Sequence, residues 1–166
     1  MIPTLRTERL TLRPYTLGDF TAYAAFLGTP RARFMGGPLD ADGAWAYFTN
    51  DVAQWALAGI GGLLVEPSDG GAPVGQVALC HGLFPEPELG WFLYDGHEGR
   101  GYATEAAAGL LRWARDTGAV ASLVSYIDAG NHASRRLAER LGATRDPDAA
   151  TPNGSPTLVY RYGWAA

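Results

Sequence analysis

A glycine-containing turn, Gly99-Arg100-Gly101, is the feature of this sequence best suited to bind a charged ligand. It follows an apolar strand candidate that ends near Tyr94 and directly precedes a segment with helical periodicity. The start of a helix presents unpaired backbone N–H groups and the positive end of the helix dipole, and glycine allows an anion to approach the main chain closely. Arg100 can add a charge-assisted hydrogen bond. The junction therefore suits a pyrophosphate, although a purely structural left-handed turn would also explain the glycines.

Two common nucleotide-binding patterns fit this turn poorly. All 13 basic residues are arginines, so no lysine is available for the Walker position. The chain also lacks an initial β-α-β unit with three suitably spaced glycines. The turn therefore does not indicate a Walker or dinucleotide-binding protein.

The three histidines and the single cysteine do not form a recognisable site. His81, His97 and His132 are scattered and lack partners at the spacing of metal ligands. Cys80 adjoins His81, but adjacent strand residues point to opposite faces, so this pair does not suit a nucleophile and its base. We therefore expect no metal site and no cysteine chemistry.

Strands and helices that could position the turn follow from hydrophobic periodicity and from glycine and proline punctuation. Strands are expected at residues 5–13, 60–66, 74–80, 88–94, 121–127 and 157–162, and helices at 20–27, 40–58, 103–116 and 132–141. The helix over 40–58 carries Trp45, Tyr47, Phe48 and Trp55, which belong either to the core or to an acceptor pocket. The order of elements predicts one mixed α/β domain spanning residues 1–166.

Composition restricts the class of protein. The chain has 166 residues of which 47% are apolar, enough for one core without disulfides. A net charge of -4 argues against nucleic acid as a partner, and no apolar run suggests a signal peptide or a membrane span. With a single thiol, Cys80, the sequence predicts a cytoplasmic protein.

Four separated segments, in order, resemble the GNAT superfamily of N-acetyltransferases, in the branch of the ribosomal-protein N-terminal (alanine/serine) acetyltransferases. They are Thr7-Glu8-Arg9-Leu10-Thr11-Leu12-Arg13-Pro14, Glu88-Leu89-Gly90-Trp91-Phe92-Leu93, Gly99-Arg100-Gly101-Tyr102-Ala103-Thr104-Glu105-Ala106, and Asn131-x-x-Ser134 with Leu137 and Leu141-Gly142. The resemblance implies a mostly antiparallel sheet flanked by about four helices and splayed between its fourth and fifth strands. It also implies a homodimer.

The resemblance further implies acetyl-CoA as cosubstrate. Its pantetheine arm would pair with the backbone of Trp91, Phe92 and Leu93, and Asn131 would steady that arm. Its pyrophosphate would bind the turn residues, which are Gly99, Arg100, Gly101, Tyr102, Ala103 and Thr104. An opened strand pair suits such a ligand because it leaves backbone N–H and C=O groups unpaired.

Acetyl transfer to an amine needs a base for the ammonium, a donor for the oxyanion and an acid for the departing thiolate. Glu88 is the candidate base, with Glu86 placed to raise its pKa by like-charge repulsion, unless Glu88 is simply a solvated carboxylate. The resemblance makes backbone N–H near Leu93 the oxyanion donor. It makes Ser134 the acid, because Ala138 stands where many members carry a tyrosine, unless Ser134 is an ordinary first-turn residue.

The chain is expected to acetylate a primary amine, either a small molecule or a peptide N-terminus, by direct attack in a ternary complex. The alternative is a non-catalytic module that binds or senses acyl-CoA. Glu98 departs from the family pattern, because a carboxylate beside the pyrophosphate should weaken CoA binding unless it points away.

Overall fold

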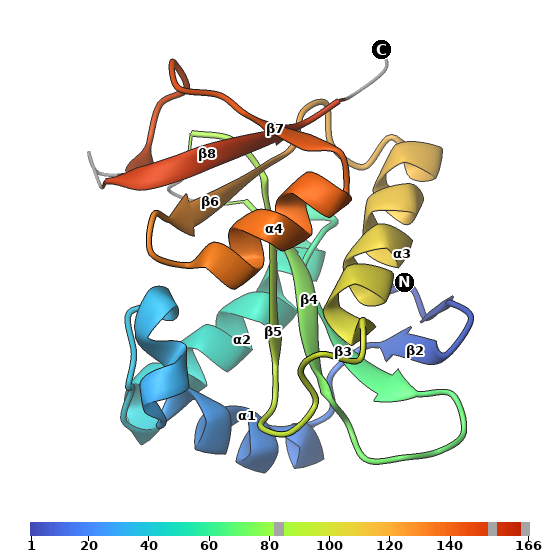
Figure 1. The fold of residues 1–166 in the computed structure, drawn as a ribbon. Coiled ribbons are helices and arrows are strands. Elements are labelled where there is room, and N and C mark those ends of the chain that lie inside the picture. Colours follow the sequence, from blue (N-terminus) through green and yellow to red (C-terminus); the bar gives the residue numbers. More distant parts are fainter. Residues whose placement is uncertain (82–84, 153–155, 164–166) are drawn as a thin grey trace.

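An eight-stranded sheet with the order β1-β2-β3-β4-β5-β6-β8-β7 forms the framework of the protein (Figure 1). The computed structural model describes residues 1–81, 85–152 and 156–163. The strands are β1 (Leu5–Arg6), β2 (Leu10–Arg13), β3 (Gly62–Pro67), β4 (Gly75–Cys80), β5 (Glu88–Leu93), β6 (Val124–Asp128), β7 (Ala143–Arg145) and β8 (Thr157–Tyr162). Neighbouring strands are antiparallel except for β5 and β6, which are parallel.

Helices cover both faces of the sheet (Figure 1). The described residues form four α-helices, α1 (Phe20–Leu27), α2 (Ala41–Ala58), α3 (Tyr102–Thr117) and α4 (His132–Arg140), and two short 3-10 helices, η1 (Leu17–Asp19) and η2 (Pro30–Met35). One face carries α1 and α2, and the other carries α3 and α4. The expected mixed α/β fold, mostly antiparallel and flanked by about four helices, is confirmed.

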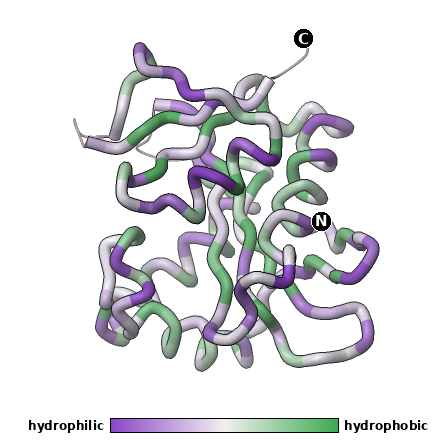
Figure 2. The backbone as a smooth tube through the Cα atoms, viewed as in Figure 1, coloured by the Kyte–Doolittle hydropathy of each residue, from purple (hydrophilic) through white to green (hydrophobic). Residues whose placement is uncertain are grey.

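The apolar core has two parts, one on each side of the sheet. The larger part packs α3 and α4 against the central strands, with Leu79, Leu89 and Leu110 almost fully buried. The smaller part joins α1 and α2 around Phe92. In Figure 2 hydrophobic residues gather along the central strands, whereas hydrophilic residues predominate in α4.

The predicted opening strand over residues 5–13 is wrong as a single element. Instead, β1 and β2 pair with each other, with Leu5 opposite Leu12, and residues 7–9 form the turn between them. The Thr7 N–H donates to the Leu10 carbonyl at 2.9 Å, which closes this turn. Alternation of apolar and polar residues has the same period in one strand as in two short paired strands, so the pattern did not show the reversal.

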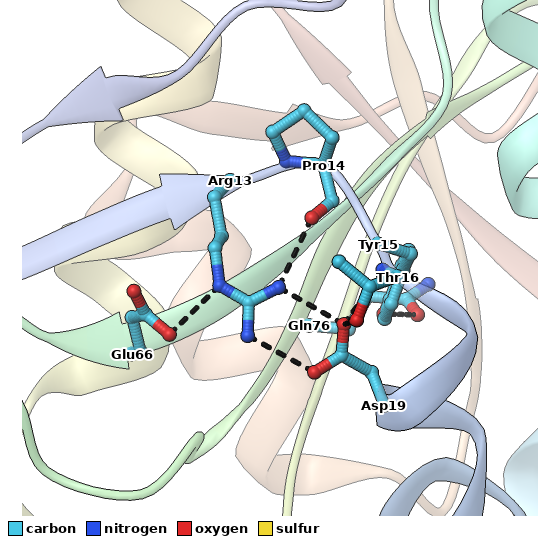
Figure 3. Close-up of polar contacts among 7 residues, drawn as sticks. All are labelled: Arg13, Pro14, Tyr15, Thr16, Asp19, Glu66 and Gln76. Atoms are coloured by element: carbon cyan, nitrogen blue, oxygen red, sulfur yellow. Dashed lines mark hydrogen bonds and ion pairs between the residues drawn. The ribbon is translucent and has the colours of Figure 1, made fainter.

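A network around Arg13 links the end of β2 to the start of α1 (Figure 3). The Arg13 guanidinium donates to Glu66 at 2.8 Å and to both carboxylate oxygens of Asp19 at 2.9 and 3.0 Å. The Asp19 carboxylate also accepts from the Thr16 N–H at 2.7 Å, as in a capping box. These contacts set the direction in which the chain leaves the sheet and enters α1.

The sheet opens between β5 and β6, which diverge in Figure 1. The two strands pair only at Glu88 and Val124. Just beyond this bridge, the Ser125 hydroxyl donates to the Leu89 carbonyl at 2.5 Å. The predicted splay between the strands at 88–94 and 121–127 is therefore present, and it widens toward the carboxyl end of β5.

Candidate functional site

A cleft of about 820 Å³ lies where β5 and β6 diverge. We call it the central cleft. Ten of the residues predicted to bind the cofactor line it, namely Trp91, Phe92, Leu93, Gly99, Gly101, Tyr102, Ala103, Thr104, Asn131 and Ser134. Arg100 and Glu88 are not among the residues that line it. Three segments that are distant in the sequence therefore meet in one cavity.

The backbone of β5 offers hydrogen-bonding groups to this cleft. Tyr94 donates its N–H to Val74, next to β4, at 2.9 Å. Because backbone groups alternate in direction along a strand, those of Phe92 also point toward β4, whereas those of Trp91 and Leu93 point into the gap. A ligand with amide groups could pair with the backbone of Trp91 and with the Leu93 N–H as a further strand would, whereas the Leu93 carbonyl accepts from the Arg31 guanidinium at 3.2 Å.

The turn before α3 has the geometry of an anion cradle. Gly99 and Gly101 adopt left-handed conformations, with φ of 73° and 80°, which strongly favour glycine. A side chain at position 99 would meet no atom within 4 Å, so the space above this residue is open. The first helical donor is the Glu105 N–H, bonded to Gly101 at 3.0 Å, so the N–H groups of residues 102–104 have no acceptor within the helix. This cradle fits a pyrophosphate.

Asn131 and Ser134 lie together at the start of α4. The Asn131 side-chain oxygen accepts from the Ser134 backbone N–H at 3.2 Å and caps the helix. The Asn131 amide nitrogen and the Ser134 hydroxyl are not used by this cap. Ala138 is fully buried in the larger core and does not line the cleft.

Arg100 is exposed, and only its backbone carbonyl has a described contact, accepting from Arg9 at 3.0 Å. This hydrogen bond is one of several from the β1–β2 turn that hold the glycine turn in place, and the sequence did not predict them. Glu105 accepts hydrogen bonds from the Thr7 hydroxyl at 2.6 Å and from the backbone and side chain of Arg9, both at 2.7 Å. Although burial acts to raise the pKa of Glu105, these donors outweigh it and hold the pKa below its usual range. The β1–β2 turn thus holds the cradle in place.

Glu88 stands at the single bridge between β5 and β6 and points to the face covered by α1 and α2. Burial raises the pKa of its carboxyl to about 7, and a hydrogen bond from the Tyr126 backbone N–H opposes the shift. On the same face, a side chain at Gly90 would meet no atom within 4 Å, so a hollow lies beside Glu88. A half-buried carboxylate with this pKa is suited to accept a proton near neutral pH.

The predicted influence of Glu86 on Glu88 is wrong. Glu86 is paired with Arg161 at 2.7 and 2.8 Å, and it accepts from the Ser122 hydroxyl at 2.7 Å. The ion pair holds the pKa of Glu86 below its usual range, and the high pKa of Glu88 comes from burial. Glu86 therefore serves to tie the segment before β5 to β8.

Glu98 does not point away from the turn. It lines the central cleft and forms an ion pair with Arg31 of η2, which lines the cleft as well. Sequence reasoning identified the unfavourable carboxylate but not its counter-ion, because Arg31 lies 67 positions earlier in the chain.

Of the aromatic residues of α2, Phe48 and Trp55 belong to the core or pack against it, whereas Trp45 and Tyr47 are partly exposed and do not line the central cleft. Phe48 is buried in the smaller core, where it contacts Tyr15, Phe20 and Tyr23. Tyr47 is 41% exposed. Burial raises the pKa of Tyr47, and nearby Asp51 and Glu88 add to the effect, which places this exposed phenol on the same side as the candidate base.

Within the described residues, no group of three or more histidine, cysteine, aspartate or glutamate side chains could hold a metal ion. No helix in that part of the chain is long and apolar enough to cross a bilayer.

Comparisons with known proteins agree with this geometry. Residues 9–144 match the family model described as the acetyltransferase (GNAT) domain. A solved acetyltransferase from Agrobacterium tumefaciens is 50% identical, with 98% of this chain and 95% of that chain covered and a TM-score of 0.93. A putative GNAT-family acetyltransferase from Bordetella pertussis is 27% identical, with 98% and 100% covered and a TM-score of 0.80.

A putative ribosomal-protein-serine acetyltransferase from Vibrio cholerae shares the fold, with 22% identity, 96% of this chain and 97% of that chain covered, and a TM-score of 0.72. The family match covers every residue that lines the central cleft and the whole of the turn before α3. The chain therefore belongs to the GNAT acetyltransferase family and is an acetyl-CoA-dependent acyltransferase.

Proposed function

We propose that this protein transfers the acetyl group of acetyl-CoA to a primary amine, carried by a small molecule or by a peptide N-terminus. The observation that carries the proposal is the position of Glu88 relative to the cleft. The backbone groups of Trp91 and the Leu93 N–H, which point into the gap, lie between the cradle at Gly99 and this carboxylate. If the pyrophosphate of acetyl-CoA binds at the cradle and its pantetheine arm pairs with those backbone groups, the acetyl end of the ligand extends toward Glu88.

Acetyl-CoA supplies the acyl group as a thioester, and the residues of the chain bind it and move protons. The N–H groups of residues 102–104 and the left-handed glycines suit the pyrophosphate. Arg100 remains a proposed contact, because its exposed side chain can turn toward a phosphate. The backbone of Trp91 and Leu93, with the Asn131 amide, suits the pantetheine amides. Phe92 contributes its buried ring to the wall of the cleft.

Proton transfer is assigned to two side chains on opposite sides of the gap. Glu88 faces the hollow at Gly90 and, with a pKa of about 7, can take the proton of an incoming ammonium near neutral pH. The Ser134 hydroxyl can donate to the departing sulfur, and the Leu93 N–H, which points into the gap, can stabilise the oxyanion. Orientation of the two reactants supplies much of the rate, since effective molarities on the order of 10⁵ M are available.

An amine panel tests this proposal. The purified chain is incubated with acetyl-CoA and with peptide N-termini, polyamines or aminoglycosides, and free CoA is measured. Amine-dependent release identifies the acceptor class. If acetyl-CoA binds but no amine promotes release, the chain is instead the acyl-CoA-binding module considered from the sequence. Acetyl-CoA should also raise the melting temperature where NAD and ATP do not, because only a ligand that binds the folded state stabilises it.

The single domain over residues 1–166, the homodimer and the cytoplasmic location stay predictions. One continuous sheet order through all described strands supports the single domain. Light scattering of the purified chain tests the homodimer.

A further inference from the structure

Arg31 connects η2 to the turn before α3. It belongs to η2, between α1 and α2, yet its guanidinium reaches across the end of β5. There it donates to the Leu93 carbonyl and to Asp95, both at 3.2 Å, and forms the ion pair with Glu98. Its guanidinium also lies 5.6 Å from the centre of the Phe26 ring. Four contacts therefore hold one side chain, 32% exposed, at the mouth of the central cleft.

The contact between Arg31 and Glu98 matters because the Glu98 charge bears on ligand binding at the turn. Its carboxylate directly precedes the Gly99 cradle and lines the same cleft. Two like unit charges a few ångströms apart near a protein surface repel one another substantially, and a diphosphate carries more than one charge. A turn that carries an uncompensated carboxylate here would oppose the ligand that its backbone is shaped to bind.

We propose that Arg31 is a positioning residue that neutralises Glu98 and so allows this turn to bind the diphosphate of CoA. The inference rests on the proposed function, in which the cradle receives that diphosphate. Arg31 fills this role because it is the arginine in contact with Glu98 and because its Leu93 contact keeps it beside the turn. By the same contacts it holds η2, which brings Phe34 and Met35 to the cleft, against the end of β5.

Asp95 supplies an internal control. It also contacts Arg31, but its side chain is 95% exposed and it does not line the cleft. Exposed ion pairs contribute little, so its carboxylate should have little effect on a ligand in the cradle. The proposal thus distinguishes two carboxylates that share one arginine.

The test is a double-mutant cycle on CoA binding, measured by titration calorimetry at low salt. Arg31→Gln should weaken CoA binding roughly tenfold, equivalent to about 1.4 kcal/mol. Glu98→Gln alone should leave binding unchanged or strengthen it. Arg31→Gln combined with Glu98→Gln should restore affinity to within about threefold of the original protein, whereas Arg31→Gln combined with Asp95→Asn should not, since coupled neighbours depart from additivity.

Two further variants separate charge from packing. Arg31→Lys keeps the charge but not the planar fork that contacts Leu93, Asp95 and Phe26, so it should bind CoA more tightly than Arg31→Gln and less tightly than the original protein. Arg33→Gln removes another arginine from η2, one that lies over Phe34 at 4.5 Å, and should leave CoA binding unchanged. The deficit of Arg31→Gln should also shrink as salt is raised, because salt screens an exposed charge.

A double variant as weak as Arg31→Gln alone, or a deficit that does not respond to salt, would overturn the proposal. Those results leave the proposed function intact, because the original protein still binds CoA. Failure of the original protein to bind CoA would instead contradict the proposed function. Melting temperatures of all variants show whether a loss of binding reflects a loss of folding.

Discussion

Glu88 is a candidate base because of where it lies rather than because of a neighbouring charge. Its position at the only bridge between β5 and β6 places the carboxyl among packed atoms, and this burial raises its pKa to about 7. A carboxylic acid with that pKa is partly ionised at neutral pH and is still basic enough to accept a proton.

The first prediction concerns this carboxyl. Glu88→Gln should lower turnover about 100-fold, because an amide cannot accept the ammonium proton. In the original protein kcat/KM should rise with pH through about 7 as Glu88 loses its proton, and level off above that pH. In Glu88→Gln, kcat/KM should not show this rise with pH. Initial rates over a range of amine concentrations at each pH, with acetyl-CoA saturating, give both turnover and kcat/KM and test both statements.

Glu86→Gln serves as the control for the cause of the shift. Since burial sets the pKa of Glu88, removal of the neighbouring charge should leave the inflection near its original pH, whatever it does to stability. Unchanged turnover in Glu88→Gln would remove Glu88 from the base role.

The second prediction concerns Ser134. Replacement by alanine should lower turnover roughly 10-fold to 100-fold, less than a full acid contribution because water can substitute. The helix cap should survive, because Asn131 accepts from the backbone of residue 134 and not from its hydroxyl. Ser68→Ala, a serine between β3 and β4 remote from the cleft, is the control. Equal turnover in Ser134→Ala and Ser68→Ala would contradict the assignment.

At the residue scale the sequence identified the groups but not all of their partners. The glycine turn, Asn131 and Ser134 were recognisable because backbone demands and local spacing are visible in the sequence. The Arg31 and Glu98 pair was not, because it joins η2 to a turn far along the chain. The cause of the Glu88 shift depends on burial, which a sequence does not display.

Among the elements, the β1–β2 turn has a role larger than its length suggests. It donates three hydrogen bonds to Glu105, in the first turn of α3, and one to the Arg100 carbonyl. The cradle is thereby held from the amino-terminal edge of the sheet. Thr7 and Arg9 therefore contact the glycine turn and the start of α3 although they lie far from both in the sequence.

The third prediction follows from the low pKa of Glu105. A carboxyl whose pKa is lower in the folded state contributes stability above its unfolded pKa and loses it as pH falls. Glu105→Gln should therefore lower the free energy of unfolding by about 1 kcal/mol near neutral pH, since it weakens charge-assisted hydrogen bonds. The difference between the two proteins should shrink as pH falls well below 4.5, the ordinary value for this group. Urea denaturation at neutral and acidic pH measures it.

Glu8→Gln provides a matched comparison, because Glu8 occupies the same turn and is exposed. Its removal should change stability little at either pH. Equal losses in the two variants would show that the turn, and not the Glu105 contacts, determines the effect.

Element boundaries were predicted well where an element is long and periodic, as in α2 and α3. They failed where a short strand has little pattern of its own. Ala143–Arg145, which pairs with β8 as β7, was not predicted, and the opening strand proved to be two. Three residues cannot establish a period, so their pairing is determined by the tertiary fold.

At the scale of the whole molecule, the sheet separates two environments. The central cleft is lined from both faces, by α3 and α4 and by Phe26 and η2, whereas a buried polar cluster lies on the face under α1 and α2. Asp51 of α2 is 4% exposed and accepts from the Tyr23 hydroxyl at 2.7 Å. Cys80 of β4 lies 3.9 Å from the other carboxylate oxygen. Nearby, the Tyr15 hydroxyl donates to Gln76 (Figure 3). This cluster fixes both helices to β4, the strand that pairs with β5 and its Glu88.

The fourth prediction is a pH dependence of global stability that arises from Asp51. Burial raises its pKa from 3.8 to about 6, and hydrogen bonds from Tyr23, Gln76 and Cys80 oppose the shift. A carboxyl with a raised folded pKa binds more protons when folded, so stability falls as pH rises from its unfolded toward its folded value. The loss attributable to this group amounts to up to about 3 kcal/mol, at 1.36 kcal/mol per pH unit.

Asp51→Asn should remove that loss, because an amide stays neutral yet still accepts from Tyr23. The free energy of unfolding of the variant, relative to the original protein, should therefore increase between about pH 4 and pH 7. Asp42→Asn, at an exposed position in the first turn of α2, should show no such change. Urea denaturation of the three proteins at both pH values gives the comparison, in which acid effects common to all of them cancel. If the free energies of unfolding of Asp51→Asn and the original protein differ by the same amount at both pH values, Asp51 is charged to the same extent in the folded and unfolded states. The polar cluster would then tolerate a full negative charge beneath the sheet.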